Sequence, residues 1–347
     1  MGLFLVLIAI NHHWLNAWYL PLFYDPFSAF QRWTFGRLPF SVGDTILYGV
    51  LIFVAYRFFR WLVGKMKQRQ KQAIQQSMRW KAVMHYLNGI LAIILVFYLF
   101  WGLNYFRPTI RQEMVFDFAK PDQGQLVELN RKLLDSVHAY YASSQSARGG
   151  LFMKDSLFFF ASKCFAKEQT RFDNWILETN SLKYSMWSWL GDLTGVAGYY
   201  NPFTGEAQLN RNLPVFLKPF VACHELAHQL GYANESEANF VGYLTCRQST
   251  HPLFRYAAHL EMLMLANRQL RLTDPAAAET VLKQCQTGVQ TDLQTWKNYQ
   301  GKQSRLLESL FETVFDIFLK TNRQEDGIRS YDAAVMLYLA YERQYGS

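Results

Sequence analysis

The stretch CHELAHQLGYANESEANF, residues 223–240, decides how the second half of the chain is expected to fold. Apolar residues recur with helical spacing from residue 213 and stop at Gly231, which is a suitable helix C-cap. Asn234 then predicts the start of another helix, because its side chain can accept a backbone N–H from the first turn. Two helices joined by a short connection are therefore expected here.

Two histidines in the first of these helices suggest a metal site. His224 and His228 are four residues apart and would project from one helix face. Two imidazoles at this spacing can hold one zinc ion, and Glu225 could act as general base toward the attacking water. Chance alone would give H-E-x-x-H about 0.007 times in a chain of this length and composition. The motif therefore predicts Zn2+ as cofactor rather than two histidines buried in a core.

A catalytic zinc site needs a third protein ligand, and two glutamates compete for this role. Glu237 is three positions beyond Asn234, where it could return a hydrogen bond to the cap in a capping box. Glu235 lies about 200° around the helix from Glu237, so the two cannot both face the metal. We expect Glu235 to be the third ligand, with Glu237 as the alternative. Asn239, one turn after Glu235, could orient a ligating histidine.

Hydrolases of this type often use a Tyr, His or Arg side chain to stabilise the developing oxyanion. The candidates downstream of the motif are Tyr256, His259, Arg329 and Tyr331. Packing or surface exposure is the commoner role for such residues, and the sequence does not select one of them.

Residues 109–347 are expected to form one domain, and its pattern is mainly helical. Breaks in the helical spacing fall near residues 273–275, 298–302 and 322–327. Residues 185–210 differ, because Gly, aromatic and turn residues dominate and PFTGE suggests a tight turn between short strands. The expected fold class is mainly α with a small β-sheet (α+β). The sheet could bind an extended peptide as an added strand.

Charge divides the chain into two parts. Residues 1–108 carry 11 Lys/Arg and 2 Asp/Glu, whereas residues 109–347 carry 24 and 25. Eight of the eleven basic residues fall within 57–81, between apolar segments at 45–64 and 82–106. We therefore expect a membrane region at 1–108 with a cytoplasmic basic loop. The C-terminal domain has no basic excess, which argues against nucleic-acid binding.

The N-terminus and the orientation follow from the same pattern. No basic start and no small-residue cleavage site mark a cleaved signal peptide, so a third span is expected within residues 1–24. The membrane region would then hold two to three transmembrane helices. If loop 57–81 is cytoplasmic, the C-terminal domain lies outside the cytoplasm, in an oxidising compartment. The sequence leaves the disulfide pairing of four cysteines open: Cys164, Cys223, Cys246 and Cys285.

Several stretches resemble an uncharacterised bacterial family of membrane-anchored, zincin-like proteins of the gluzincin type, known as a domain of unknown function. These stretches are LPFSVGD (38–44), WGLNYFRP (101–108), GYYNPFTGEAQLN (198–210), LP…PF…HELAHQLGYANESEANFVGYL (213–244) and DGIRSY (326–331). Glu235, Ala238 and Asn239 are also similar to the E-x-x-A-D motif of membrane zinc proteases of the CaaX-processing kind, with Asn in place of Asp. The resemblance implies N-terminal transmembrane helices followed by a zincin-like metallopeptidase domain, and it implies no substrate.

The sequence therefore favours a zinc metallopeptidase of the HExxH type, expected to be an endopeptidase. We expect it in the bacterial inner (cytoplasmic) membrane, acting on protein or peptide substrates on the periplasmic side. One alternative is a non-catalytic membrane protein that uses zinc to stabilise a binding or sensing domain. Glu225 argues against it, because a structural zinc needs no general base. The other alternative is a zinc hydrolase acting on a non-peptide bond of the cell envelope.

Overall fold

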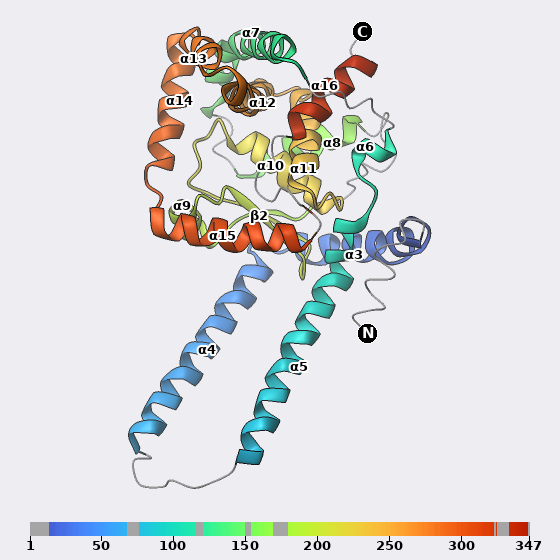
Figure 1. The fold of residues 1–347 in the computed structure, drawn as a ribbon, viewed down its shortest axis with the longest axis vertical. Coiled ribbons are helices and arrows are strands. Elements are labelled where there is room, and N and C mark those ends of the chain that lie inside the picture. The colour runs from blue at the N-terminus through green and yellow to red at the C-terminus, as the bar shows by residue number, and fades with distance from the viewer. Residues whose placement is uncertain are drawn as a thin grey trace.

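The computed structural model describes residues 14–67, 76–114, 121–149, 154–168, 180–322, 324 and 333–345. These residues are mostly helical and include a small three-stranded sheet, which confirms the expected fold class. Two long helices project together from one end of a helical domain (Figure 1).

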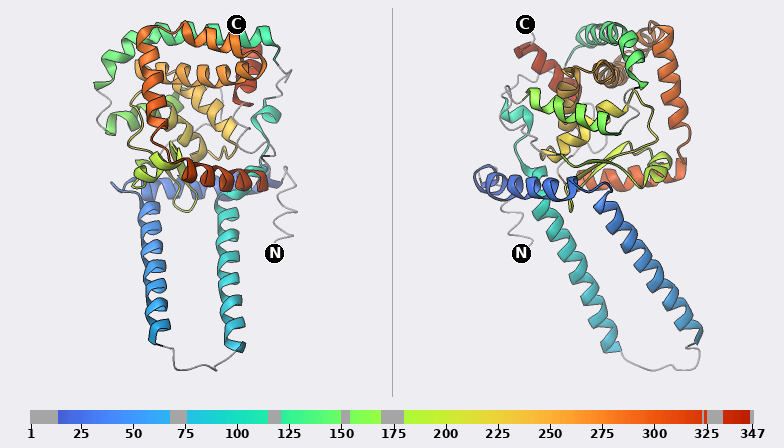
Figure 2. Two further views of the ribbon diagram at one scale, coloured as in Figure 1. Left: turned by 60° about the vertical axis from the view of Figure 1, so that its left-hand side comes forward. Right: turned by 180° about the vertical axis from the view of Figure 1, so that it is seen from behind.

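The projecting pair consists of α4 (Val42–Lys67) and α5 (Gln76–Phe100), which lie side by side in every view (Figures 1 and 2). Each contains a segment long and apolar enough to cross a membrane, Val42–Gly64 and Val83–Phe100, and neither segment is buried in the protein. They match the two apolar segments in the sequence except at residues 101–106, which follow the end of α5 and include the buried Trp101 and Leu103. Residues 1–13 of the expected third span lie outside the described residues, and the described part of the chain holds no third helix of this kind.

The described remainder of the expected third span is the π-helix η1 (Leu15–Tyr24), which continues into α3 (Asp25–Gly36). Pro21 lies inside η1 and lacks a backbone N–H, which favours an irregular helix. The Tyr19 hydroxyl donates a hydrogen bond to the carbonyl of Leu99 at the end of α5 (2.9 Å). This segment therefore packs at the junction between α5 and the domain.

The sheet has the strand order β1-β3-β2, with β1 (Leu182–Tyr184), β2 (Gly198–Asn201) and β3 (Glu206–Leu209). Strand β3 pairs parallel with β1 and antiparallel with β2, so β2 is an edge strand. The predicted PFTGE turn joins β2 to β3, and Gly205 has a φ of +64°. The sequence does not predict helix α9 (Ser188–Thr194) between β1 and β2.

Helix α12 is buried along most of its length, and several of the other helices pack around it. The predicted breaks at 273–275 and 298–302 separate α12 from α13 and α14 from α15. In chain order, these helices are η2 (Gly102–Phe106), α6 (Ile110–Glu113), α7 (Gln123–Ala147), α8 (Lys154–Glu168), α10 (Lys218–Gln229), α11 (Glu235–Arg247), α12 (Pro252–Thr273), α13 (Pro275–Lys283), α14 (Thr287–Gln300), α15 (Arg305–Thr321) and α16 (Ala333–Tyr345).

A buried ion pair attaches α4 to the sheet. Lys183 of β1 lies 2.7 Å from Glu206 of β3, and its Nζ also donates to the carbonyl of Phe35 near the end of α3 and to that of Phe40 before α4 (2.6 Å each). The Glu206 carboxylate accepts the backbone N–H groups of Val42 (3.0 Å) and Gly43 (2.6 Å). A carboxylate in this position satisfies donors that the first helical turn leaves unpaired. The sheet therefore fixes the start of a membrane-type helix.

The four cysteines are core residues. Cys164, Cys223, Cys246 and Cys285 are all buried and none of them is disulfide-bonded, so the structure contains none of the disulfides that the sequence left open. Burial raises the pKa of the Cys223 and Cys246 thiols, which keeps them protonated. Such cysteines behave as small apolar residues.

Candidate metal centre

Helix α10 carries the two histidines and ends where the sequence predicts. Gly231 has a φ of +89°, and its N–H donates to the carbonyl of His228 (2.9 Å). The N–H of Tyr232 donates to the carbonyl of Ala227 (3.3 Å), which completes a Schellman motif. The chain therefore turns sharply after α10 and can pass back toward the histidines.

Two arginines from the membrane-proximal part of the chain satisfy the last carbonyls of this region. Arg32 of α3 donates to the carbonyl of Gln229 (3.0 Å), and Arg107 donates to the carbonyl of Leu230 (3.1 Å). Positive charge at a helix C-terminus also interacts favourably with the helix dipole. These hydrogen bonds connect the end of α10 to residues that flank α4 and α5.

Helix α11 brings the glutamates to α10. The Asn234 side chain accepts the N–H groups of Ser236 (2.9 Å) and Glu237 (3.4 Å), so it caps α11 as predicted. Gly242 lies two turns after Glu235 on the same face of α11, where an added Cβ would be 3.1 Å from the backbone N and Cα of His224. The missing side chain at Gly242 therefore allows α11 to approach α10 closely.

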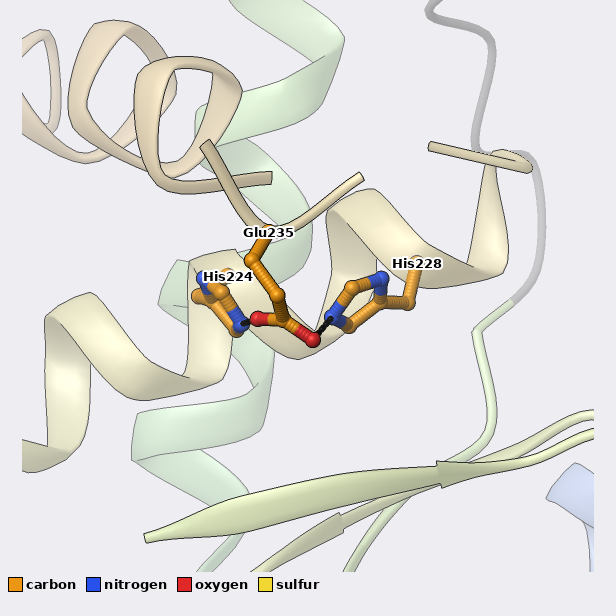
Figure 3. A group of neighbouring side chains, drawn as sticks. All are labelled: His224, His228 and Glu235. Carbon is orange, nitrogen blue, oxygen red and sulfur yellow. Dashed lines mark ion pairs between the residues drawn. The ribbon is translucent and has the colours of Figure 1, made fainter. Parts of the chain in front are cut away.

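His224, His228 and Glu235 converge in a group that could hold a metal ion (Figure 3). Their potential ligand atoms all lie within 4.8 Å of one another. The Glu235 carboxylate lies between the two rings, with Oε2 3.4 Å from Nε2 of His224 and Oε1 3.8 Å from Nε2 of His228. The two ring planes are perpendicular, and their centroids are 4.8 Å apart. Two imidazole nitrogens and one carboxylate are a ligand set typical of catalytic zinc.

Hydrogen bonding prepares His228 for this role. Its Nδ1 lies 2.6 Å from the carbonyl of Tyr232, which holds the proton on Nδ1 and leaves Nε2 free to bind a metal. Burial lowers the pKa of His228 to about 4, so the ring is neutral at physiological pH. The edge of the Trp101 ring packs near this imidazole, with centroids 6.2 Å apart.

His224 is held differently. Burial disfavours its charged form, but its hydrogen bond with Glu235 and the nearby charge of Glu225 outweigh this effect and raise its pKa. Asn239 contributes in the same direction and lines the same cavity. The Nδ1 atom of His224 is buried without a hydrogen-bond partner among the described residues. Orientation of a histidine by Asn239 therefore stays a prediction.

Glu225 follows His224 in α10 and lines the same cavity. Its side chain is buried, and Oε2 has no hydrogen-bond partner in the part of the chain that the structure describes. Burial raises the pKa of Glu225 to about 8, while the neighbouring His224 lowers it and Glu235 raises it further. A buried carboxylate with a free oxygen can take up a proton from a group in the cavity.

Glu237 has a structural contact of another kind than the capping box predicted from the sequence. Its Oε1 accepts the backbone N–H of Ile110 (2.7 Å), the first residue of α6. Burial raises the pKa of Glu237 to about 7, against the lowering effects of this hydrogen bond and of Arg107. The bond predicted from the Glu237 side chain back to the N-cap was wrong, because the carboxylate accepts the N–H of another helix, distant in sequence.

A cavity of about 1050 Å³ surrounds the three potential ligands. The edge strand β2 forms one wall, and Figure 3 shows strands passing beneath the labelled side chains. At Gly198 of β2, an added Cβ would be 2.8 Å from Cδ of Glu225, so the backbone passes directly against this carboxylate. The position of β2 suits the binding of an extended peptide next to Glu225.

Two of the four oxyanion candidates from the sequence, Tyr256 and His259, do not line this cavity. The Tyr256 hydroxyl donates to Asp292 (2.6 Å), which also pairs with Arg148. His259 has its Nδ1 2.8 Å from the carbonyl of Arg255 and packs between Tyr rings. Both residues are explained by packing, and neither lines the cavity. The other two candidates, Arg329 and Tyr331, lie outside the described residues.

Two residues that the sequence analysis did not select do line the cavity. Tyr105, from the WGLNYFRP stretch, lies close enough to Glu235 for this charge to contribute to its raised pKa, after the larger effect of burial. Glu261 of α12 faces His224, and burial raises its pKa to about 7. Neither has a local spacing signal, because both reach the cavity from segments far from residues 223–240.

The fold and the site together define a mostly helical protein with two membrane-type helices and a His-His-Glu group that could hold a metal ion. The chain belongs to the family described as "Protein of unknown function (DUF3810)", whose model matches residues 19–339. No curated protein and no solved structure matches the chain in the same comparisons.

Proposed function

We propose that this protein is a membrane-anchored zinc metallopeptidase that cleaves protein or peptide substrates on the extracytoplasmic side of the bacterial inner membrane. The observation that carries the proposal is the Glu225 carboxylate, which is buried beside the His-His-Glu group with one oxygen unpartnered among the described residues. Burying a carboxylate oxygen without a hydrogen bond is costly, so its presence beside this group favours a functional role. A purely structural metal site has no use for it.

The residues of the site fit zinc. The Nε2 atoms of His224 and His228 and the carboxylate of Glu235 would hold it, and the hydrogen bond from His228 to Tyr232 leaves the correct nitrogen free. When bound, zinc supplies Lewis-acid chemistry and lowers the pKa of a coordinated water toward neutrality.

Residues of the chain would transfer the proton, bind the substrate and stabilise the oxyanion. Glu225 accepts a proton from the attacking water and passes it to the nitrogen of the leaving amine as the peptide C–N bond breaks. Strand β2 holds the substrate backbone in an extended form. Tyr105 replaces Tyr256 and His259 as the candidate donor to the developing oxyanion, because its ring lines the cavity near Glu235.

The orientation is proposed from charge. Basic residues concentrate in the segment that joins the two apolar helices, and such segments stay in the cytoplasm. The domain lies at the ends of α4 and α5 that are farther from this joining segment (Figure 1). It would therefore lie outside the cytoplasm, where it could reach envelope proteins.

Replacing Glu225 tests the proposal. We expect Glu225→Gln to lower turnover by about 10²–10⁴-fold while zinc content stays unchanged, because the general base is lost and the ligands are kept. Cells that carry this variant should accumulate an uncleaved envelope protein, visible in a proteomic comparison with wild type. Glu279→Gln, which removes an exposed carboxylate paired with Lys283, is the matched control and should behave as wild type.

Other outcomes would favour the alternatives. Undiminished cleavage by Glu225→Gln would refute the mechanism. Bound zinc with no difference between the two proteomes would favour a binding or sensing protein. Altered cell-wall fragments with unchanged polypeptides would favour hydrolysis of a non-peptide bond.

A further inference from the structure

Helix α15 carries an apolar stripe on its outer face. Leu306, Leu310, Val314 and Ile317 follow one another at spacings of four, four and three residues, which places them on one side of the helix. Each is between 55% and 69% exposed. Single exposed apolar residues are common on soluble proteins, but a continuous stripe marks a surface that contacts a partner or a membrane.

The start of α15 contacts α9, which lies next to the root of α4. The N–H of Ser304, the residue before α15, donates to the carbonyl of Leu193 in α9 (3.0 Å). Next to α9, the ring of Trp187 stacks on Tyr48 of α4, with centroids 3.9 Å apart.

The end of α15 lies beside α5. The ring of Phe318 contacts Phe97 of α5, with centroids 5.9 Å apart. Asn322, just after α15, accepts a hydrogen bond from the Tyr98 hydroxyl (3.0 Å). Phe97 and Tyr98 belong to the segment that is long and apolar enough to cross a membrane. Helix α15 therefore lies across the end of the domain from which α4 and α5 project (Figures 1 and 2).

Aromatic residues elsewhere near the roots of the two helices have the character of a membrane interface. Phe30 and Trp33 of α3 are about half exposed, and Arg37 lies over the Trp33 ring at 4.0 Å. Trp189 of α9 is also half exposed. Trp and Arg side chains are typical of the headgroup region, where one end can be apolar and the other hydrated.

The other side of α15 faces the candidate metal centre. Phe311, Phe315 and Phe318 line the cavity together with Phe97 and Trp101. One helix thus separates the outer apolar stripe from the cavity that contains the His-His-Glu group. Whatever contacts the stripe is therefore adjacent to the aromatic wall of the cavity.

We infer that α15 is seated on the lipid bilayer through this stripe, and that the cavity serves polypeptides held in the same membrane. The apolar surfaces of α4 and α5 are exposed like the stripe, and α15 packs against the root of α5, which favours lipid over a soluble protein as the occupant of the stripe. The aromatic wall then meets a substrate as it leaves the bilayer. The part on substrates rests on the proposed function, whereas the seating of α15 does not.

A depth measurement tests the seating. The full chain, reconstituted in phosphatidylcholine vesicles, carries an environment-sensitive fluorophore at Leu310→Cys, and lipids with a quencher high in the acyl chain are added. The four native cysteines are buried, and the unsubstituted chain controls for their labelling. Leu272→Cys is the matched control, because Leu272 is a 75% exposed leucine near the end of α12.

We expect strong quenching at position 310 and none at position 272. Equal, weak quenching at both positions would overturn the inference. A position 310 that is shielded from water but not quenched by lipid would also overturn it, and would indicate a protein partner on the stripe.

The substrate class is tested with a pair of peptides. The sequence released in the proteomic comparison is offered with and without a transmembrane anchor in the same vesicles. We expect several-fold faster cleavage of the anchored form, and Leu310→Glu/Val314→Glu should remove this preference without changing zinc content or cleavage of the free form. Equal rates for both peptides with wild type would overturn the substrate class. Cleavage of neither would refute the proposed peptidase and leave the quenching result standing.

Discussion

At the scale of single residues, the contact between Gly198 and Glu225 sets the geometry of the proposed base. A Cβ at position 198 would lie 2.8 Å from Cδ of Glu225 and from the carbonyl oxygen of Gln208. The sheet cannot move away easily, because Gln208 belongs to the neighbouring strand β3. Any side chain at position 198 must therefore displace the carboxylate.

We predict that Gly198→Ala lowers the turnover of the substrate found in the proteomic comparison by about 100-fold, the effect typical of a misplacement of about 1 Å at a reacting group. Zinc content should not change, since the atoms nearest to this Cβ belong to Glu225 and Gln208 and not to the three ligands. The control is Gly301→Ala, where an added Cβ meets only ordinary contacts at 3.5 Å. Full activity of Gly198→Ala would contradict the placement of Glu225.

Local spacing in the sequence predicts some residues of the site but not others. The i, i+4 spacing of His224 and His228 and the cap at Asn234 act within a few residues, so the sequence reveals them. The contact from Glu237 to Ile110 joins residues 127 positions apart. Tyr105 likewise reaches the cavity from another segment. Such contacts depend on tertiary packing, which a single sequence does not display.

At the scale of elements, the buried pair Lys183–Glu206 joins the sheet to the start of α4. Glu206 is fully buried and accepts two backbone N–H groups of α4 in addition to the Lys183 ammonium. A buried charge that loses its partner is strongly destabilising. The attachment of the membrane-type helix therefore depends on this carboxylate.

Replacing Glu206 tests whether the attachment of α4 depends on its carboxylate. We predict that Glu206→Gln costs about 3–5 kcal/mol of unfolding free energy, because it leaves the Lys183 charge buried. The cost should appear as a lower melting temperature of the detergent-solubilised protein, and Lys183→Met/Glu206→Gln should recover part of it. Glu279→Gln, at an exposed ion pair, should leave the melting temperature unchanged. An unaltered melting temperature for Glu206→Gln would rule out this role.

The elements themselves differ in how far the sequence predicts them. Gly231 ends α10 as predicted, because its φ of +89° is a conformation that glycine adopts without strain. Helix α9 was missed, since its seven residues lie in a stretch rich in glycine and aromatic residues. The pattern of α15 is amphipathic. Its position between the cavity and the projecting helices comes only from the fold.

At the scale of the whole molecule, the membrane-type helices and the candidate metal centre form one structure. Trp101, directly after α5, packs against the ring of His228, and Arg32 and Arg107 bind the carbonyls after the histidine motif. Charge asymmetry along the chain suggests on which side of a membrane this unit lies. The site is thus built at the base of the domain rather than at its far end.

The most direct test of the account is the metal content of the purified full-length protein, measured by mass spectrometry for wild type, Glu235→Gln and Glu237→Gln after identical dialysis. We predict about one zinc ion per chain in wild type and in Glu237→Gln, and a strong loss in Glu235→Gln, because only Glu235 lies between the two histidines. Wild-type protein without zinc, or normal zinc in Glu235→Gln together with its loss in Glu237→Gln, would contradict the account.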